Sequence, residues 1–268
     1  MVELNVNGKV AVVTGGSRGL GLDCAEVLAV NGASTIVITS RKAKACEEAK
    51  AQIEKVAAGA GKKVKVISIP ADLSDEKDTQ RFFDETSKQV DKVDILIANA
   101  GASWGSPLEQ HPVSAVKKVL DLNIVGVFQS IQLFTPLLEK AGTAEDPSRV
   151  LIMSSIASIS PVDFAGTYGY LASKAGVTHM GKNLALQLGP RNITVNSLAP
   201  GFFPSKMSNG LLEVAGDVLI ETNPRKRLGK KQDIQDLVLF MCAKQSSYIN
   251  GIVIPLDGGA HLGSFSKL

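Results

Sequence analysis

Residues 10–21 decide the fold of this chain, and they read Val10-Ala11-Val12-Val13-Thr14-Gly15-Gly16-Ser17-Arg18-Gly19-Leu20-Gly21. The apolar residues at the start predict a strand that is buried on both faces. The glycines allow a sharp turn and a close approach of the backbone to a bound group. A helix begins inside this turn, and the free N–H groups of its first turn favour a phosphate. The segment therefore predicts a strand, a phosphate-binding turn and a helix; a tight turn that binds nothing is the alternative.

Short β-branched segments alternate with longer amphipathic segments along the rest of the chain. Strand character is found in residues 10–13, 35–38, 64–69, 93–98, 150–153, 193–197 and 252–254. Helical spacing of apolar residues is found in residues 43–57, 76–90, 113–138 and 178–188. This alternation predicts an α/β fold, a doubly wound parallel sheet of the Rossmann type with about seven strands and helices on both faces. Since no linker divides the pattern, we expect residues 1–268 to form a single domain, with residues 263–268 as an exposed tail.

Composition and charge exclude several classes of protein. Hydrophobic residues make up 44% of the 268 residues and charged residues 21%, which is typical of a globular chain rather than a disordered one. The net charge of +3 is too small to predict nucleic-acid binding. We interpret the basic residues between 225 and 231 as a solvated loop rather than a nucleic-acid or nuclear-import patch. Three cysteines without ligand spacing predict neither a disulfide framework nor a metal site, and no apolar stretch is long enough to span a membrane.

The last three residues, Ser266-Lys267-Leu268, match the C-terminal address that the peroxisomal import receptor reads. A chance match is the alternative. We expect a peroxisomal location with that receptor as a partner, and a cytoplasmic location if the tripeptide is not read.

Residues 39–42 bear on the choice between NAD and NADP, and they read Thr39-Ser40-Arg41-Lys42. An acidic side chain at the end of the second strand would bind the adenosine ribose of NAD, whereas an arginine accommodates the extra phosphate of NADP. Arg41 stands here without a carboxylate, and Arg18 of the glycine turn can converge on the same phosphate. This pattern predicts NADPH, and two surface arginines without a ligand are the alternative.

On a set of ordered motifs the chain resembles the short-chain dehydrogenase/reductase family over nearly its whole length. The glycine turn is the first motif. The motif at residues 98–101 differs from the family's usual Asn-Asn-Ala-Gly only in its first residue, which is Ala98 here. The motifs follow in the family's order: Thr14–Gly21, Asp72-Leu73, Ala98-Asn99-Ala100-Gly101, Asn123, Ser154-Ser155, Tyr170 with Lys174, Pro200-Gly201 and Leu256-Asp257-Gly258-Gly259.

The resemblance implies four catalytic residues: Asn123, Ser155, Tyr170 and Lys174. Tyr170 would give a proton to the developing alkoxide, and a phenol with a pKa near 10 needs help to do so at neutral pH. Lys174 lies one helical turn further on, where its ammonium would lower the pKa of that phenol and hold the nicotinamide ribose. Ser155 would bind the substrate oxygen, and Asn123 would anchor a water on the proton path.

The glycine turn, the residues after the second strand and the family motifs together define the expected cofactor contacts. These are Gly15, Ser17, Arg18, Gly19, Leu20, Gly21, Ser40, Arg41, Asp72, Leu73, Asn99, Ala100, Gly101, Tyr170, Lys174, Pro200, Gly201, Phe203 and Ser205. No metal is expected.

Two choices among neighbouring residues stay open in the sequence. Ser154 is an alternative to Ser155, and Tyr168 precedes Tyr170 but has Ala172 rather than a lysine four residues on. Ser155 and Tyr170 are also slightly further apart than is usual in the family. We therefore expect a short insertion within residues 156–167 that reshapes the substrate pocket.

Three functions compete at this stage. The first is an NADPH-dependent reductase of a 3-oxoacyl thioester or another medium-sized ketone, which the four catalytic positions favour. The second is a peroxisomal enoyl-CoA or dienoyl-CoA reductase, and the Tyr170–Lys174 pair counts against it. The third is an NADPH-binding sensor or scaffold without catalysis. The resemblance also implies a homotetramer built by the helices after the fourth and fifth strands.

Overall fold

The computed structural model describes residues 4–161, 165–206 and 208–263. Its strands form one parallel sheet in the order β3-β2-β1-β4-β5-β6-β7. The strands are β1 (Val10–Thr14), β2 (Thr35–Thr39), β3 (Lys65–Ser68), β4 (Ile95–Ala98), β5 (Ser148–Met153), β6 (Ile193–Pro200) and β7 (Val253–Leu256). The peroxisomal address at Ser266–Leu268 lies outside the described residues and stays a prediction.

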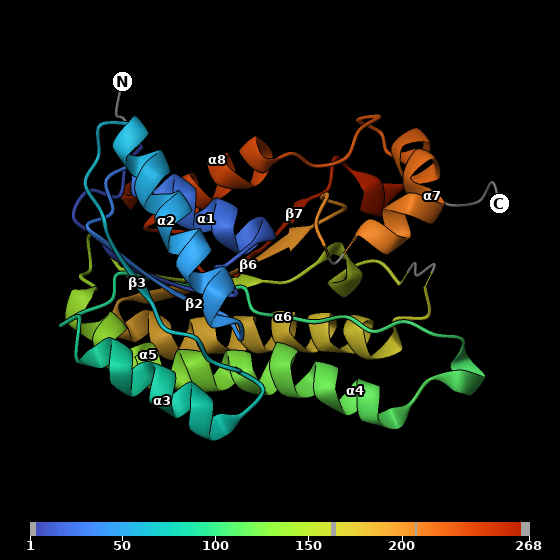
Figure 1. Cartoon of the computed structure of the whole chain (residues 1–268), viewed down its shortest axis with the longest axis horizontal. Helices are drawn as coiled ribbons and strands as arrows, with labels where there is room; N and C mark the ends of the chain where they lie inside the picture. Colours follow the sequence, from blue (N-terminus) through green and yellow to red (C-terminus); the bar gives the residue numbers. More distant parts are fainter. Residues whose placement is uncertain (1–3, 162–164, 207, 264–268) are drawn as a thin grey trace.

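Helices cover both faces of this sheet. They are α1 (Gly19–Val30), α2 (Ala43–Gly59), α3 (Glu76–Ser87), α4 (Val113–Leu120), α5 (Val127–Ala141), α6 (Tyr168–Leu188), α7 (Asn209–Thr222) and α8 (Lys231–Cys242). Figure 1 shows α1, α2 and α8 on one face and α3, α4, α5 and α6 on the other. The doubly wound parallel α/β fold is confirmed.

Alternate residues of the strands supply the two halves of the core. Val13 and Ile38 belong to the cluster under α1, α2 and α8, whereas Val12 and Val37 belong to the cluster under α3, α5 and α6. All four side chains are fully buried, as expected for a parallel sheet covered on both faces. Because both faces of each strand are buried, the strands are continuous apolar segments in the sequence and do not alternate between apolar and polar residues.

The chain reverses its direction of winding between β1 and β4. β1 pairs with β2 on one side and with β4 on the other. A ligand crevice forms at such a switch point, outside the carboxyl ends of the strands. The fold therefore gathers the residues after β1, β2, β4, β5 and β6 at one edge of the sheet.

Two helical features differ from the sequence expectation. Residues 113–138 are not one α-helix, because residues Asp121–Gly126 form a π-helical turn between α4 and α5. A π turn admits one extra residue and is frequent at functional sites. Residues 231–242 form α8, whose buried face consists of Ile234, Val238, Met241 and Cys242. These apolar residues are spaced by four, three and one positions, which is typical of one face of a helix. The interpretation of residues 225–231 as a loop considered only their charge and so did not extend to this helix.

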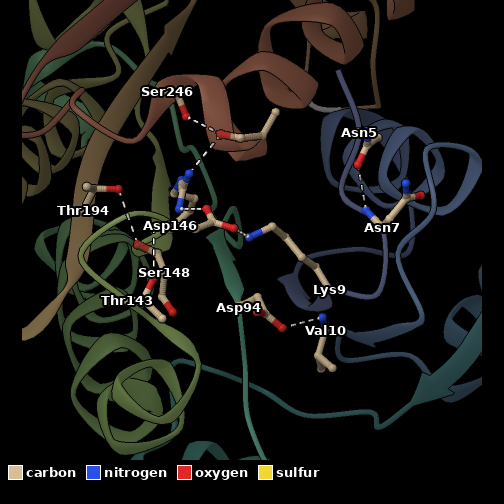
Figure 2. Close-up of polar contacts among 12 residues, drawn as sticks. Asn5, Asn7, Lys9, Val10, Asp94, Thr143, Asp146, Ser148, Thr194 and Ser246 are labelled. Carbon is tan, nitrogen blue, oxygen red and sulfur yellow. Dashed lines mark hydrogen bonds and ion pairs between the residues drawn. The ribbon is translucent and has the colours of Figure 1, made fainter. Parts of the chain in front are cut away.

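A buried ion-pair cluster joins elements at the amino ends of the strands. Arg149, at the start of β5, is 1% exposed, and its Nη2 donates to the Ala243 carbonyl oxygen at 2.9 Å. Its Nη1 lies 2.9 Å from Oδ1 of Asp146, an ion pair whose alignment is too poor for a hydrogen bond. Asp146 also accepts a 2.8 Å hydrogen bond from Nζ of Lys9, the residue before β1 (Figure 2). The cluster therefore ties β1, β5 and the end of α8 together.

None of the helices within the described ranges is long and apolar enough to cross a bilayer.

Candidate active site

The turn after β1 is packed tightly against the end of β4. A Cβ on Gly21 would lie 2.3 Å from the carbonyl oxygen of Gly15, so a side chain cannot be accommodated there. Gly15 has a φ of +65°, which L side chains rarely adopt. The amide nitrogen of the Asn99 side chain donates to the carbonyl oxygens of Thr14 at 2.9 Å and Gly15 at 3.2 Å. Asn99 therefore shapes the phosphate turn from the neighbouring strand.

The amino end of α1 is open to an anion. Arg18 is the N-cap residue and is exposed, and no side chain in the described part of the chain caps this helix. The N–H groups of the first turn are therefore available to a ligand. A Cβ on Gly19 would have the Ser205 Cβ as its nearest neighbour, at 3.8 Å. The loop after β6 thus comes within contact distance of the phosphate turn, and the residues fit a dinucleotide.

The end of β2 carries positive rather than negative charge. Arg41 and Lys42 are exposed, and Ser40 lies between them and the strand. The Oγ of Ser40 lies 3.1 Å from Sγ of the buried Cys46, which fixes the start of α2. Residues 40–42 therefore offer a guanidinium, an ammonium and a hydroxyl to the adenosine end of the site, and no carboxylate.

The segment after β3 is held by its own side chains and by the π turn. Oδ1 of Asp72 accepts from the backbone N–H of Ser74 at 3.1 Å and from its hydroxyl at 2.7 Å. Leu73 is buried, and a Cβ on Gly126 would lie 2.1 Å from the Leu73 carbonyl oxygen. This contact positions Asp72 and Leu73 beside the π turn, at the edge of the sheet where the other expected cofactor contacts lie.

Tyr170 lies in the first turn of α6 and is hydrogen-bonded to Ser155. Burial raises the pKa of the Tyr170 hydroxyl, and the hydrogen bond from Ser155 lowers it in part, with a net upward direction. Ser155 follows β5, and its Oγ also accepts from the backbone N–H of Ala157 at 3.1 Å. The phenol is therefore neutral at physiological pH and has a hydroxyl neighbour suited to bind the same substrate oxygen.

Lys174 lies one turn after Tyr170 on the same side of α6. Its Nζ donates to the Met153 carbonyl oxygen at 2.7 Å and lies 5.6 Å from the centre of the Tyr170 ring. Burial lowers the pKa of Lys174 to about 8. The net direction of the Tyr170 pKa is therefore upward rather than downward as expected, because desolvation is the largest influence on the phenol. Both groups have lost their hydration, and the lysine nitrogen is engaged by a backbone carbonyl.

Asn123 lies in the π turn and is 1% exposed. Its Oδ1 accepts from the backbone N–H of Ala102 at 2.9 Å, and its Nδ2 donates to the Ala102 carbonyl oxygen at 2.9 Å and to the Ser173 hydroxyl at 2.9 Å. A Cβ on Gly101 would lie 3.3 Å from Oδ1 of Asn123 and 3.6 Å from Nζ of Lys174. Asn123 and Lys174 thus both lie close to Gly101, in the segment that leaves β4.

The structure distinguishes the two pairs of neighbouring candidates. The hydroxyl of Ser154 is 2.5 Å from that of Thr178 and 3.4 Å from the Lys174 carbonyl oxygen, and the residue is 4% exposed. Tyr168 is 44% exposed, and its ring packs edge-on against His111 with centroids 5.3 Å apart. The Ser154 hydroxyl is therefore occupied by contacts with α6, whereas Ser155 is the serine that is hydrogen-bonded to Tyr170.

The loop after β6 is held in place by contacts with the end of β7 and with its own residues. The backbone N–H of Gly201, just after Pro200, donates to the Leu256 carbonyl oxygen at 3.0 Å. Phe203 is 7% exposed, and a Cβ on Gly229 would clash with its ring at 2.4 Å. The Phe203 carbonyl oxygen accepts from the Ser208 hydroxyl at 2.6 Å. These contacts hold the loop against the end of β7.

Sequence reasoning missed two groups that position the reacting side chains. Ser173 is fully buried and donates to the Tyr170 carbonyl oxygen at 2.7 Å while it accepts from Asn123. The Met153 carbonyl oxygen holds the Lys174 ammonium. The only sequence signal for Ser173 is a polar residue next to Lys174 in the helix. The backbone carbonyl of Met153 has no signal in the sequence.

Fold and site together define an NADP-linked oxidoreductase, and the chain belongs to the short-chain dehydrogenase/reductase family. A family model described as "Enoyl-(Acyl carrier protein) reductase" matches residues 15–261. The chain is 38% identical to a rhamnolipids-biosynthesis 3-oxoacyl-[acyl-carrier-protein] reductase of Pseudomonas aeruginosa, over 95% of this chain and 97% of that one. It is 31% identical to the short-chain dehydrogenase/reductase PhomF of Diaporthe leptostromiformis, over 95% of this chain and 92% of that one. Among solved structures, the Pseudomonas aeruginosa RhlG/NADP active-site complex matches with a TM-score of 0.89 and 36% identity, over 96% of this chain and 98% of that one.

Proposed function

We propose that this protein is an NADPH-dependent reductase of a 3-oxoacyl thioester or a similar medium-sized ketone, with Tyr170 as the proton donor. The observation that carries the proposal is the partly buried Tyr170, whose hydroxyl is hydrogen-bonded to Ser155 and which is followed one turn later by Lys174. Two findings support it further. The curated relative from Pseudomonas aeruginosa is named as a 3-oxoacyl reductase, and the matching solved structure is an NADP complex.

Each side chain has a distinct task in this reaction. When bound, the reduced nicotinamide supplies the hydride that adds to the carbonyl carbon. Ser155 donates a hydrogen bond to the carbonyl oxygen and so favours the negative charge that develops on it. Tyr170 gives its proton to that oxygen, so that the ketone becomes a secondary alcohol. Lys174 supplies a positive charge beside the resulting phenolate, and Asn123 holds the adjacent backbone at Ala102.

The protonation state of Tyr170 suits its role as the acid in ketone reduction. A raised pKa keeps the proton on Tyr170 until an alkoxide, which is a stronger base than a phenolate, draws it away. The reverse reaction would need the phenolate to form in a buried site before the alcohol loses its proton, which desolvation opposes.

A comparison of two thioesters tests the proposed reaction against its alternative. The family model bears the name of an enoyl reductase, whose substrate is reduced at a carbon–carbon double bond. We expect NADPH oxidation with a 3-oxoacyl-CoA and at least about 100-fold slower oxidation with a trans-2-enoyl-CoA of the same chain length, since a general acid contributes roughly 10²–10⁴-fold. Equal rates on the two thioesters, or a faster rate on the enoyl form, would contradict a ketone substrate.

The rate of reduction should fall as the pH rises through about 8. Burial lowers the pKa of Lys174 to about 8, so its ammonium is charged below that pH and neutral above it. The raised pKa of Tyr170 keeps the phenol protonated throughout this range. We therefore expect kcat/KM for the ketone to decline about tenfold per pH unit above 8, in a profile measured from pH 6 to 10 at saturating NADPH. A profile that stays flat to pH 10 would remove the lysine charge from the mechanism.

Cofactor preference should depend on Arg41. Arg41→Asp replaces a cation with an anion at the end of β2, so it repels the adenosine phosphate of NADPH and offers a carboxylate to the ribose hydroxyls of NADH. We expect the ratio of kcat/KM for NADPH to that for NADH to fall about 100-fold, as a loss of a few kcal/mol of charge-assisted bonding implies. Lys44→Asp is the matched control, because Lys44 is exposed on α2 and pairs only loosely with Glu48 at 3.9 Å. An equal change in both variants would show a general charge effect.

We also propose a homotetramer assembled through α4, α5 and α6. Val113, Val125, Phe128 and Tyr168 are large apolar residues of these helices and the π turn, and they are 70%, 44%, 42% and 44% exposed. Apolar exposure of this kind on neighbouring helices is typical of an interface. Gel filtration with light scattering should give four times the 28.2 kDa mass of the chain. A stable monomer at micromolar concentration would contradict the assembly.

A further inference from the structure

A cavity of about 230 Å³ lies behind the loop that follows β6. Phe202 and Phe203 line one side of it, and Asn223, Arg225 and Asp257 line another. Of the described residues that line this cavity, none belongs to the phosphate turn or to the four catalytic candidates. The cavity is therefore a separate site that shares only the loop around Phe203 with the active-site crevice.

Most cations near this cavity are already engaged. Nη1 and Nη2 of Arg227 lie 2.6 Å and 2.9 Å from the two carboxylate oxygens of Asp233. Lys231 contacts the buried Glu26, and Lys226 donates to the Glu221 carbonyl oxygen. Three of the five basic residues of the run 225–231 are therefore engaged.

Arg225 is different from its neighbours. Its side chain lines the cavity, and no carboxylate within the described ranges of the chain pairs with its guanidinium. The two carboxylates that also line the cavity are satisfied elsewhere. Asp233 is taken by Arg227, and Asp257 accepts from the backbone N–H of Gly259 at 2.9 Å and from His261 at 2.8 Å and 2.7 Å. Of the two arginines that line the cavity, Arg225 is thus the one without an ion-pair partner among the described residues.

The backbone around Arg225 is held in place. The buried Asn223 accepts from the backbone N–H of Arg225 at 2.8 Å and donates to the Asp257 carbonyl oxygen at 2.9 Å. Gly258 has a φ of +67°, and a Cβ there would lie 3.0 Å from Cγ of Arg225. The stem of the arginine therefore rests against the glycine backbone, and less side-chain entropy is lost when the guanidinium binds a ligand.

We propose that this cavity binds a small carboxylate with an apolar chain, such as a medium-chain fatty acid anion. The guanidinium of Arg225 matches the planar carboxylate group, and Phe202, Phe203 and Leu256 provide apolar walls for the chain. The volume lies below the range of roughly 300–1,000 Å³ that is usual for drug-sized ligands, which favours a short chain. One unpaired guanidinium beside two carboxylates suits a monoanion better than a phosphate dianion.

Calorimetric titration of the full chain with hexanoate tests this site. We expect hexanoate to bind the wild type, and Arg225→Gln to weaken that binding at least tenfold while the melting temperature stays the same, since Arg225 is exposed. Lys230→Gln is the matched control, because Lys230 is an exposed cation of the same run that does not line the cavity. It should bind hexanoate as the wild type does.

Two neutral or differently charged probes complete the test. Hexan-1-ol, which has the same chain without the charge, and inorganic phosphate should both bind at least tenfold more weakly than hexanoate. Hexanoate binding that is unchanged in Arg225→Gln would place the acid elsewhere, for example in the substrate pocket, and would overturn the proposal. Equal binding of hexan-1-ol or phosphate would overturn it as well. Neither result depends on the ketone reductase activity.

Discussion

Replacement of Tyr170 by phenylalanine should lower kcat for ketone reduction by roughly 10²–10⁴-fold, the usual contribution of a general acid. The substitution removes one hydroxyl and leaves a ring of the same shape in a partly buried position, so α6 and the loop after β5 should keep their structure. The alkoxide would then lose this proton donor, and the neighbouring Ser155 hydroxyl is a much weaker acid than a phenol. NADPH binding, measured by quenching of protein fluorescence or by calorimetry, should change by less than about threefold, because the phosphate turn and Arg41 are untouched.

Tyr168→Phe is the matched control for this experiment. It removes the same atom two residues earlier on the same helix, from a ring that is 44% exposed and packs against His111. Its kcat should remain within a few-fold of the wild type. Activity of Tyr170→Phe within tenfold of the wild type would show that another group supplies the proton, and the assignment of Tyr170 would fail.

The reacting side chains could be predicted from the sequence because their spacing is a property of one helix. Tyr170 and Lys174 are four residues apart, so they share a face of α6 wherever that helix lies. The glycine turn was equally local, since Gly15 and Gly21 are adjacent to one buried strand. By contrast, the choice between Ser154 and Ser155 depends on which way the chain turns after β5. That direction is set by contacts with Thr178 and Ala157, which lie on other elements.

The charge state of the site was beyond the sequence for a different reason. Proximity to Lys174 suggested a lowered pKa for Tyr170, but the net shift depends on how completely both groups are desolvated. The structure buries both, and the Met153 carbonyl oxygen draws the ammonium toward β5.

The π turn at Asn123 is a similar case. Residues 113–138 have the apolar period of one long helix, and the extra residue in the turn leaves that period nearly unchanged.

Arg149 is the clearest example of a residue that pattern reasoning cannot place. A strand over residues 150–153 was expected from its apolar residues, and an arginine before it would ordinarily mark the exposed end of the strand. The structure instead extends β5 to Ser148 and leaves Arg149 1% exposed, among the Ala243 carbonyl oxygen, Asp146 and Lys9. Each of these partners comes from a distant part of the sequence or from a loop. The burial of this charge is therefore a tertiary effect.

Substitution of Asp146 by asparagine should consequently destabilise the protein more than any nearby surface change. It leaves the guanidinium of Arg149 and the ammonium of Lys9 without their shared carboxylate. Breaking a fully buried pair costs roughly 3–5 kcal/mol, and we expect about 2 kcal/mol here because Asp146 itself is 30% exposed. For a chain of this length that corresponds to a drop of about 4 °C in Tm, measured by circular dichroism. Glu145→Gln removes the same charge from an exposed neighbour and should shift Tm by less than about 1 °C.

The pH dependence of this effect gives the network a signature that a packing defect would not have. Burial tends to raise the pKa of Asp146, but the hydrogen bond from Lys9 and the charge of Arg149 outweigh it, so the pKa lies below the usual 3.8. A carboxyl with a lowered pKa in the folded state stabilises the protein at pH values above 3.8, and this contribution is lost as the pH falls through its folded value. The Tm difference between wild type and Asp146→Asn should therefore be constant from pH 8 to pH 5 and shrink as the pH approaches 3. A difference that persists undiminished in acid, or equal melting of the Asp146→Asn and Glu145→Gln variants, would mean that the ion pairs at Asp146 do not hold these strands together.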